Sequence, residues 1–76
     1  MDINLLKESN VELCENLYAL STTYLKNNQS IELNYLLDYL SKLENNIRKC
    51  NDIKSLKEYI NELHFLSERI EVIINE

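Results

Sequence analysis

The chain has 76 residues, a formal net charge of −5, and neither glycine nor proline. A chain of this length forms one domain at most, with a modest hydrophobic core. Glycine and proline supply the backbone angles of tight turns, so their absence argues against phosphate-cradling loops and short strand hairpins. The acidic balance argues against direct binding of DNA, RNA or anionic membrane surfaces.

The first apolar pattern runs over residues 3–26 and predicts a helix capped by Asp2. One row, spaced three and four apart, comprises Ile3, Leu6, Leu13, Leu17, Leu20 and Tyr24. A second row beside it comprises Val11, Cys14, Tyr18, Ser21 and Leu25. Together the rows cover about half of the helix circumference, so this helix should contact two others. Asn10 interrupts the first row, either as a buried residue that fixes register or as a hydrated one near the helix start.

The second pattern predicts a helix over residues 31–50. The polar segment Asn27-Asn28-Gln29-Ser30 precedes it, where Asn tolerates the left-handed backbone that ends many helices and Ser30 is a suitable N-cap. Its seam has no interruption and consists of Leu33, Leu36, Leu40, Leu43, Ile47 and Cys50. Ile31 and Tyr35 point away from this seam, and Tyr39 flanks it.

The third pattern predicts a helix over residues 53–75, capped by Asp52. Its apolar face comprises Ile53, Leu56, Ile60, Leu63, Ile70 and Ile74, flanked by Tyr59, Leu66 and Ile73. Phe65 and Val72 do not fit, because helical geometry turns them roughly to the opposite side. Arg69 lies between them in sequence.

Two short connections between three helices of similar length predict antiparallel neighbours. We therefore expect residues 1–76 to form a single all-α domain, a three-helix up-down-up antiparallel bundle. The alternative is a hairpin of the second and third helices that completes its core by dimerisation. In the bundle, Glu8, Glu12 and Glu15 rise from the same end as the cations Arg48, Lys49, Lys54 and Lys57. The other end carries an acidic pole, formed by Glu68, Glu71 and Glu76.

Catalytic chemistry has no visible basis in this sequence. Cys14 and Cys50 lack the spacing of a redox or zinc motif, and we expect buried thiols. The bundle sets Cys50 level with about residue 8, nearly two turns from Cys14, which disfavours a disulfide. His64, the single histidine, is expected to be a partly buried structural residue. We therefore predict no enzyme activity, no cofactor and no metal site.

Location follows from what the sequence lacks. No apolar run approaches the roughly 20 residues that span a bilayer. The start, Met1-Asp2-Ile3-Asn4, has no basic segment of the kind that opens a signal peptide. We expect a cytoplasmic protein, of the source cell or of an infected host.

Protein recognition is the remaining function. Phe65, Arg69 and Val72 form one candidate patch, and Ile31, Tyr35 and Tyr39 form another on the outer side of the second helix. Aromatic residues and Arg are frequent interface anchors, although wider helix contacts could instead bury these side chains, or a homodimer could use them. We predict a non-enzymatic, acidic helical module that binds a protein partner as adaptor, co-chaperone or inhibitor. The alternative is a phage-type acidic inhibitor, or nucleic-acid mimic, that blocks a nucleic-acid-binding protein through the acidic pole.

Overall fold

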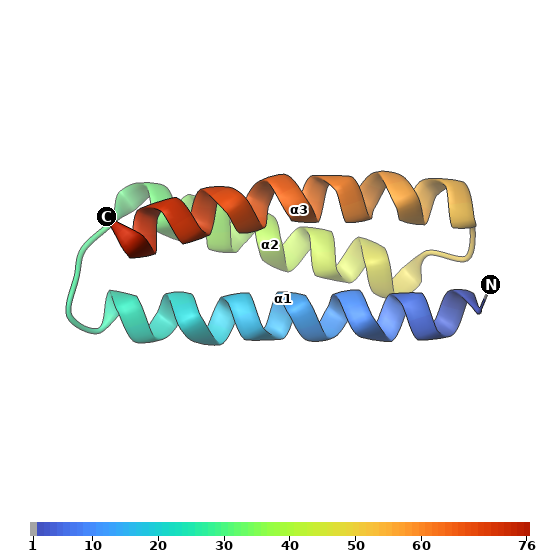
Figure 1. Ribbon diagram of the computed structural model, residues 1–76, viewed down its shortest axis with the longest axis horizontal. Coiled ribbons are helices and arrows are strands. Elements are labelled where there is room, and N and C mark those ends of the chain that lie inside the picture. Colours follow the sequence, from blue (N-terminus) through green and yellow to red (C-terminus); the bar gives the residue numbers. More distant parts are fainter. Residues whose placement is uncertain (1) are drawn as a thin grey trace.

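The structure, a computed structural model, describes residues 2–76 as three α-helices joined by two short connections (Figure 1). Helix α1 spans Ile3–Leu25, α2 spans Ile31–Lys49 and α3 spans Ile53–Asn75. Each helix begins at the residue expected from the sequence. The first two end one residue earlier than expected, and the third ends where expected.

Each helix starts at a side-chain cap. Asp2, Ser30 and Asp52 have extended backbones, and their side chains accept hydrogen bonds from the backbone N–H groups of Asn4, Leu33 and Ser55, at 3.0, 3.0 and 3.1 Å. These bonds satisfy N–H groups that have no partner within the helix. At Asp52, the donors on Ser55 (the backbone N–H and then the hydroxyl) lower the pKa of the carboxyl. All three predicted caps are confirmed.

The helix ends do without a left-handed residue. Residues 2–76 include no positive-φ position, so the connection after α1 does not use the left-handed backbone that Asn tolerates. Instead, Lys26 and Asn27 donate backbone N–H bonds to Thr23 and Tyr24, three residues back, and the Asn28 side chain also donates to the Tyr24 carbonyl. A tightened last turn of this kind is frequent at helix ends and gives the last carbonyls hydrogen-bond partners.

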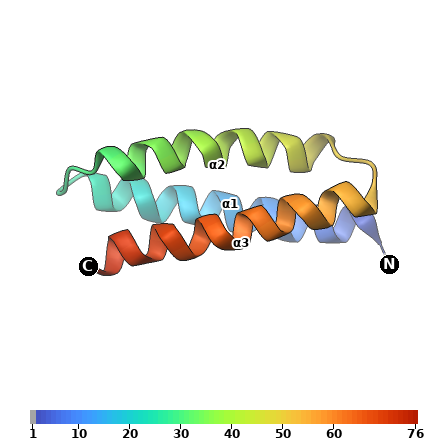
Figure 2. The ribbon, with the colours of Figure 1, turned by 90° about the horizontal axis from the view of Figure 1, so that it is seen from above.

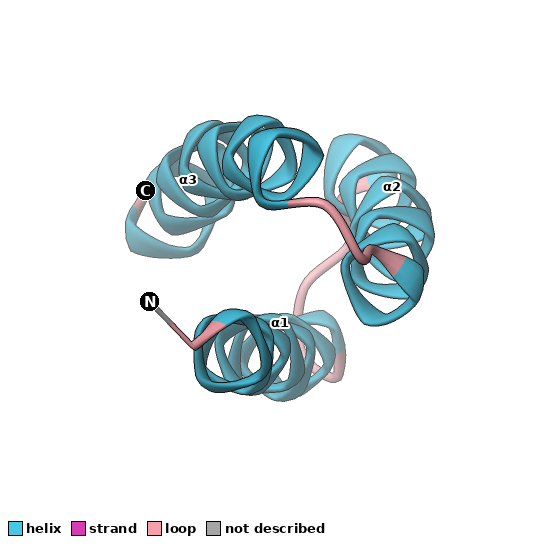
Figure 3. Cartoon of the chain, turned by 90° about the vertical axis from the view of Figure 1, so that its right-hand side faces the viewer, coloured by secondary structure: helices cyan, strands magenta, loops and turns pink. Residues whose placement is uncertain are grey.

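The helices form an up-down-up antiparallel bundle in which all three pairs are in contact (Figures 1 and 2). The molecule is a rod of 40 × 17 × 16 Å. The described chain starts at the end that holds the α2–α3 connection and finishes at the end that holds the α1–α2 connection (Figure 1). Seen end-on, the helices occupy the corners of a triangle (Figure 3). The predicted all-α three-helix bundle is confirmed.

The core lies along the axis between the helices. Its buried apolar side chains are Cys14, Leu17, Leu33, Leu37, Leu40, Leu43, Ile47, Cys50, Leu56, Leu63, Leu66, Ile70 and Ile73. In α2 the predicted seam is buried except that Leu37 takes the place of Leu36, which is half-buried. In α3 the buried face is turned towards Leu66 and Ile73, and Ile53 is exposed. Both helices therefore use the predicted face with a small rotation.

Helix α1 departs further from the expected seam. Its buried residues are Asn10, Cys14, Leu17 and Ser21, whereas Leu20 is 50 % exposed. The buried residues come from both predicted rows, so the side of α1 midway between the rows faces the core. This side is buried because α1 packs against both α2 and α3. The prediction that α1 contacts two helices is confirmed, and the placement of Leu20 in the seam is wrong.

Two polar side chains of α1 are buried in this face. Asn10 is buried, at 9 % exposure, and its side-chain Nδ2 donates to the Leu6 carbonyl of the same helix at 2.8 Å. The Ser21 Oγ is fully buried and has no hydrogen-bond partner among the described residues. A buried hydroxyl without a partner lowers stability. Neither side chain reaches across to another helix to fix the register.

Both thiols are buried and free, as predicted. The Cys50 Sγ lies 3.1 Å from the Asp52 carbonyl, to which it donates. Burial, followed by the nearby negative charge of Glu44, raises the pKa of Cys14 to about 11. Such a thiol is protonated at neutral pH and is a poor nucleophile.

Candidate functional site

The two predicted patches meet along one side of the bundle. Tyr35 of α2 and Phe65 of α3 are 72 % and 75 % exposed. They lie on the same side because α3 runs antiparallel to α2 and places residues 62–69 beside residues 32–39. Together with their neighbours they line a shallow groove of about 500 Å³, here called the α2–α3 groove. It is lined by Tyr35, Leu36, Tyr39, Glu62, Phe65, Leu66 and Arg69.

The groove has an apolar floor that belongs to the core. Leu66 is only 6 % exposed and packs in the core cluster, and Leu36 is half-buried against that cluster. Tyr35 and Phe65 extend further into solvent from the flanking turns. A floor held by core packing keeps its shape when the walls contact a ligand, which lowers the cost of binding.

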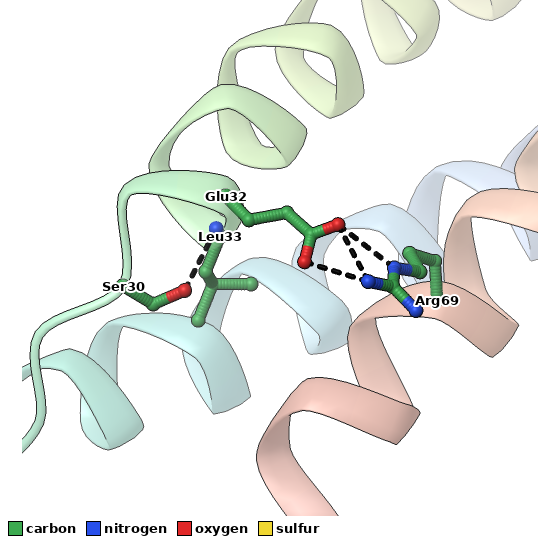
Figure 4. A network of polar contacts seen from close by, with 4 residues as sticks. All are labelled: Ser30, Glu32, Leu33 and Arg69. Atoms are coloured by element: carbon green, nitrogen blue, oxygen red, sulfur yellow. Dashed lines mark hydrogen bonds and ion pairs between the residues drawn. The ribbon is translucent and has the colours of Figure 1, made fainter.

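An ion pair between Arg69 and Glu32 lies at one end of the groove, where Arg69 is a lining residue. Figure 4 shows the pair. The guanidinium of Arg69 donates to the carboxylate of Glu32 through Nε at 2.9 Å and through Nη2 at 2.7 Å. Glu32 lies in the first turn of α2, two residues after the Ser30 cap, where the helix dipole favours a carboxylate. Both side chains are about half-exposed, so the pair is worth at most about 1 kcal/mol. Its main effect is to neutralise the cation of the groove.

A tyrosine–carboxylate bond lies near the other end. The Tyr39 hydroxyl donates to Oε1 of Glu62 at 3.1 Å. This hydrogen bond, with smaller contributions from desolvation and from the Glu62 charge, raises the pKa of Tyr39. The phenol therefore remains a donor throughout the neutral range and holds the Glu62 carboxylate at the edge of the groove.

The other predicted patch residues lie beside the groove. Ile31, 78 % exposed, lines an adjoining hollow with Asn34, Tyr35 and Asp38, so Tyr35 is shared between the two. Val72 is 47 % exposed and lies beyond Arg69 without lining the groove. All six predicted patch residues are thus exposed, and four of them come together.

Three groove residues were not predicted as part of a site. The apolar pattern assigns Leu36 and Leu66 to buried helix faces, and no motif singles out Glu62, yet all three line the groove. The spacing Glu62, Phe65, Arg69 is a helical i, i+3, i+7 series, so one face of α3 could have been extended to include Glu62. The cross-helix bond to Tyr39 could not be found without the register between α2 and α3.

A larger but polar hollow lies where α1 meets α2, here called the α1–α2 hollow. It measures about 820 Å³ and is lined by Asn4, Lys7, Glu8, Val11, Glu12, Glu15, Asn16 and Arg48. Arg48 bonds to Glu15 at 3.2 Å and to Glu44 at 3.1 Å, which confirms one of the predicted charge contacts between the first two helices. Ligand sites are usually lined by apolar and aromatic groups, so the α2–α3 groove is the stronger candidate despite its smaller volume.

The remaining chemically active side chains are dispersed. His64 is exposed on α3, so the expectation of a partly buried residue is wrong. Residues three apart share a helix face, and His64 lies on the same outward face as the exposed Asn61. Within residues 2–76 no three histidine, cysteine or acidic side chains gather as they would around a metal ion. Over the same residues, every helix is too short or too polar to cross a membrane.

Comparisons with known proteins give no relative. The chain matches no protein-family model, no curated protein and no solved structure. Its function is therefore inferred from the chemistry of its own surface.

Proposed function

We propose that this chain is a non-enzymatic protein-binding module that docks on a larger protein through the α2–α3 groove. It would act in the cytoplasm as an adaptor, co-chaperone or inhibitor. The observation that supports this is the exposure of Tyr35 and Phe65, 72 % and 75 %, on the two helices that flank an apolar floor. Aromatic side chains in such a setting are the common anchors of protein interfaces.

The polar surroundings of the groove fit an interface rather than a reaction centre. Arg69 and Tyr39 are each engaged by a carboxylate, at 2.7 and 3.1 Å. Bonds of this kind orient a rim around an apolar centre, the usual arrangement of a protein-binding surface. No nucleophile paired with a base lines the groove.

The test is capture of partners from an extract of the native source by wild type and by Phe65→Ala, followed by mass spectrometry and by affinity measurement with the captured protein. We expect Phe65→Ala to weaken binding about 30-fold, the equivalent of about 2 kcal/mol for an anchor residue. Leu5→Ala is the matched control, because Leu5 is also an exposed apolar residue but lies on α1, outside the groove. Equal affinity of Phe65→Ala and wild type would refute the proposal.

The rival is an acidic inhibitor of a nucleic-acid-binding protein, and the exposure of the acidic pole supports it. Glu68, Glu71 and Glu76 are all exposed, and none of them joins an ion pair among residues 2–76. Under this rival, replacing the three by Gln would weaken binding more than Phe65→Ala does, and affinity would fall steeply with added salt. Under the proposed function Phe65→Ala weakens binding more than the triple replacement does.

A further inference from the structure

We infer that the segment of the partner that occupies the α2–α3 groove is a basic amphipathic helix. This inference rests on the proposed function and adds the shape and charge of the occupant.

The length of the apolar surface sets the shape. The residues that line the groove run from Glu62 to Arg69 on α3, a rise of about 10 Å, and from Tyr35 to Tyr39 on α2, a rise of about 6 Å. An amphipathic helix in a groove presents anchors at i, i+3 or i+4, and i+7, which span about 10 Å. Two turns of a partner helix therefore match the groove.

The charge of the occupant follows from the charged residues near Tyr35 and Phe65. On α2 the charged residues within two turns of Tyr35 are Glu32, Asp38 and Lys42, and on α3 those within two turns of Phe65 are Glu58, Glu62, Glu68, Arg69 and Glu71. The bond between Glu32 and Arg69 cancels one charge of each sign. Lys42 is then the one remaining cation in these segments, against the carboxylates Asp38, Glu58, Glu62, Glu68 and Glu71.

Glu62 is the best placed of these carboxylates. It lines the groove, and the Tyr39 hydroxyl holds it through Oε1. A Lys or Arg one turn from an apolar anchor of the partner helix would reach this carboxylate. The charge-assisted hydrogen bond it would form is stronger than a neutral one.

A second copy of the chain fits this surface less well. Each copy carries a net charge of −5, and pairing the same face would bring two sets of these carboxylates together. A cationic helix removes this repulsion, and the charge of the whole chain would also steer it towards the groove.

The experiment is selection of binders from a display library of 15-residue helical peptides. Three positions at i, i+4 and i+7 are fixed as Leu, and the others are free. The full chain is the bait, and one recovered peptide is then measured against four variants. Phe65→Ala breaks the groove, and Glu62→Gln removes its charge. Leu5→Ala and Glu12→Gln are the matched controls on α1.

We expect recovered peptides to contain more Lys and Arg than Asp and Glu. The chosen peptide should lose at least about tenfold affinity with Phe65→Ala, several-fold with Glu62→Gln, and nothing with either control. Recovered peptides that depend on Phe65 but show no excess of Lys and Arg would overturn the basic occupant and leave the proposed function standing. Failure to recover any Phe65-dependent peptide would overturn the helical occupant, whereas the proposed function is decided separately by the capture experiment with Phe65→Ala.

Sedimentation of the free protein tests whether a second copy of the chain occupies the groove. We expect a monomer. A dimer that Phe65→Asp dissociates, with helical circular dichroism retained, would assign the groove to a second copy and overturn the inference. Phe65 is 75 % exposed, so this substitution leaves the core intact.

Discussion

The α2–α3 groove and the α1–α2 hollow both lie along contacts between antiparallel helices, yet they differ in what they expose. The groove presents Tyr35 and Phe65 above the buried Leu66. The α1–α2 hollow presents charged side chains, with Arg48 bound to Glu15 and Glu44. One bundle thus keeps one of its sides apolar and another polar.

The difference bears on where a partner gains free energy. Water already solvates the charged groups of the α1–α2 hollow, so displacing it returns little. Covering Tyr35 and Phe65 removes apolar surface from water, at about 25 cal/mol per Å². A cluster of exposed apolar side chains is common at binding surfaces, whereas a single exposed apolar residue such as Leu5 is normal on a folded protein.

The largest expected effect separates the floor of the groove from its wall. Leu66→Ala should lower the free energy of unfolding by about 2–4 kcal/mol, because it leaves a cavity in the core beneath the groove. Phe65→Ala, one residue earlier, should change it by less than about 0.5 kcal/mol because its side chain is largely in water. Urea unfolding followed by circular dichroism measures both. If the two variants lost similar free energy of unfolding, Phe65 would belong to the core as Leu66 does, and the groove would have no separate exposed wall.

The next effect concerns the thiol beneath the contact between α1 and α2. The folded pKa of Cys14 is about 11 against an ordinary value of 9.0, so the unfolded chain releases this proton first as pH rises. The resulting contribution of Cys14 to the free energy of unfolding is fully present below pH 9 and is lost between pH 9 and 11. A two-unit difference corresponds to about 2–3 kcal/mol.

The measurement is urea unfolding of wild type and Cys14→Ala at several pH values from 8 to 11. Tyrosines and lysines titrate in the same range, so the difference between the two proteins isolates Cys14. Cys14→Ala should be less stable at pH 8, and the gap should close as pH rises. A gap that stays constant would show that Cys14 titrates alike in both states.

Much of the fold could be predicted because it depends on local rules. Asp2, Ser30 and Asp52 were recognisable as caps from their types and positions, and the apolar period located the three helices. The rotation of α1 could not be predicted. Its apolar rows cover half of the circumference, and the pattern alone does not say which line within that half faces the core, so Leu20 was placed inside.

The candidate site shows the same limit. The exposure of Tyr35 and Phe65 followed from the helical period, but their meeting in one groove depends on the register between α2 and α3. Two hydrogen bonds mark that register, one from Arg69 to Glu32 and one from Tyr39 to Glu62. The paired residues are 37 and 23 positions apart in the sequence. No periodicity within one helix contains this information.

The smallest expected effect compares the ion pairs of the two regions. Arg69→Met and Arg48→Met should each lower the free energy of unfolding by at most about 1 kcal/mol, since all the partners are partly exposed. Arg69 should have the larger effect, because its guanidinium reaches both oxygens of Glu32, whereas Arg48 reaches single oxygens of Glu15 and Glu44. Urea unfolding at 0.05 and 0.5 M NaCl measures both variants, and the added salt should shrink both losses by screening. A larger loss for Arg48→Met would place the stronger electrostatic contact in the α1–α2 hollow and leave Arg69 available to a ligand instead of to Glu32.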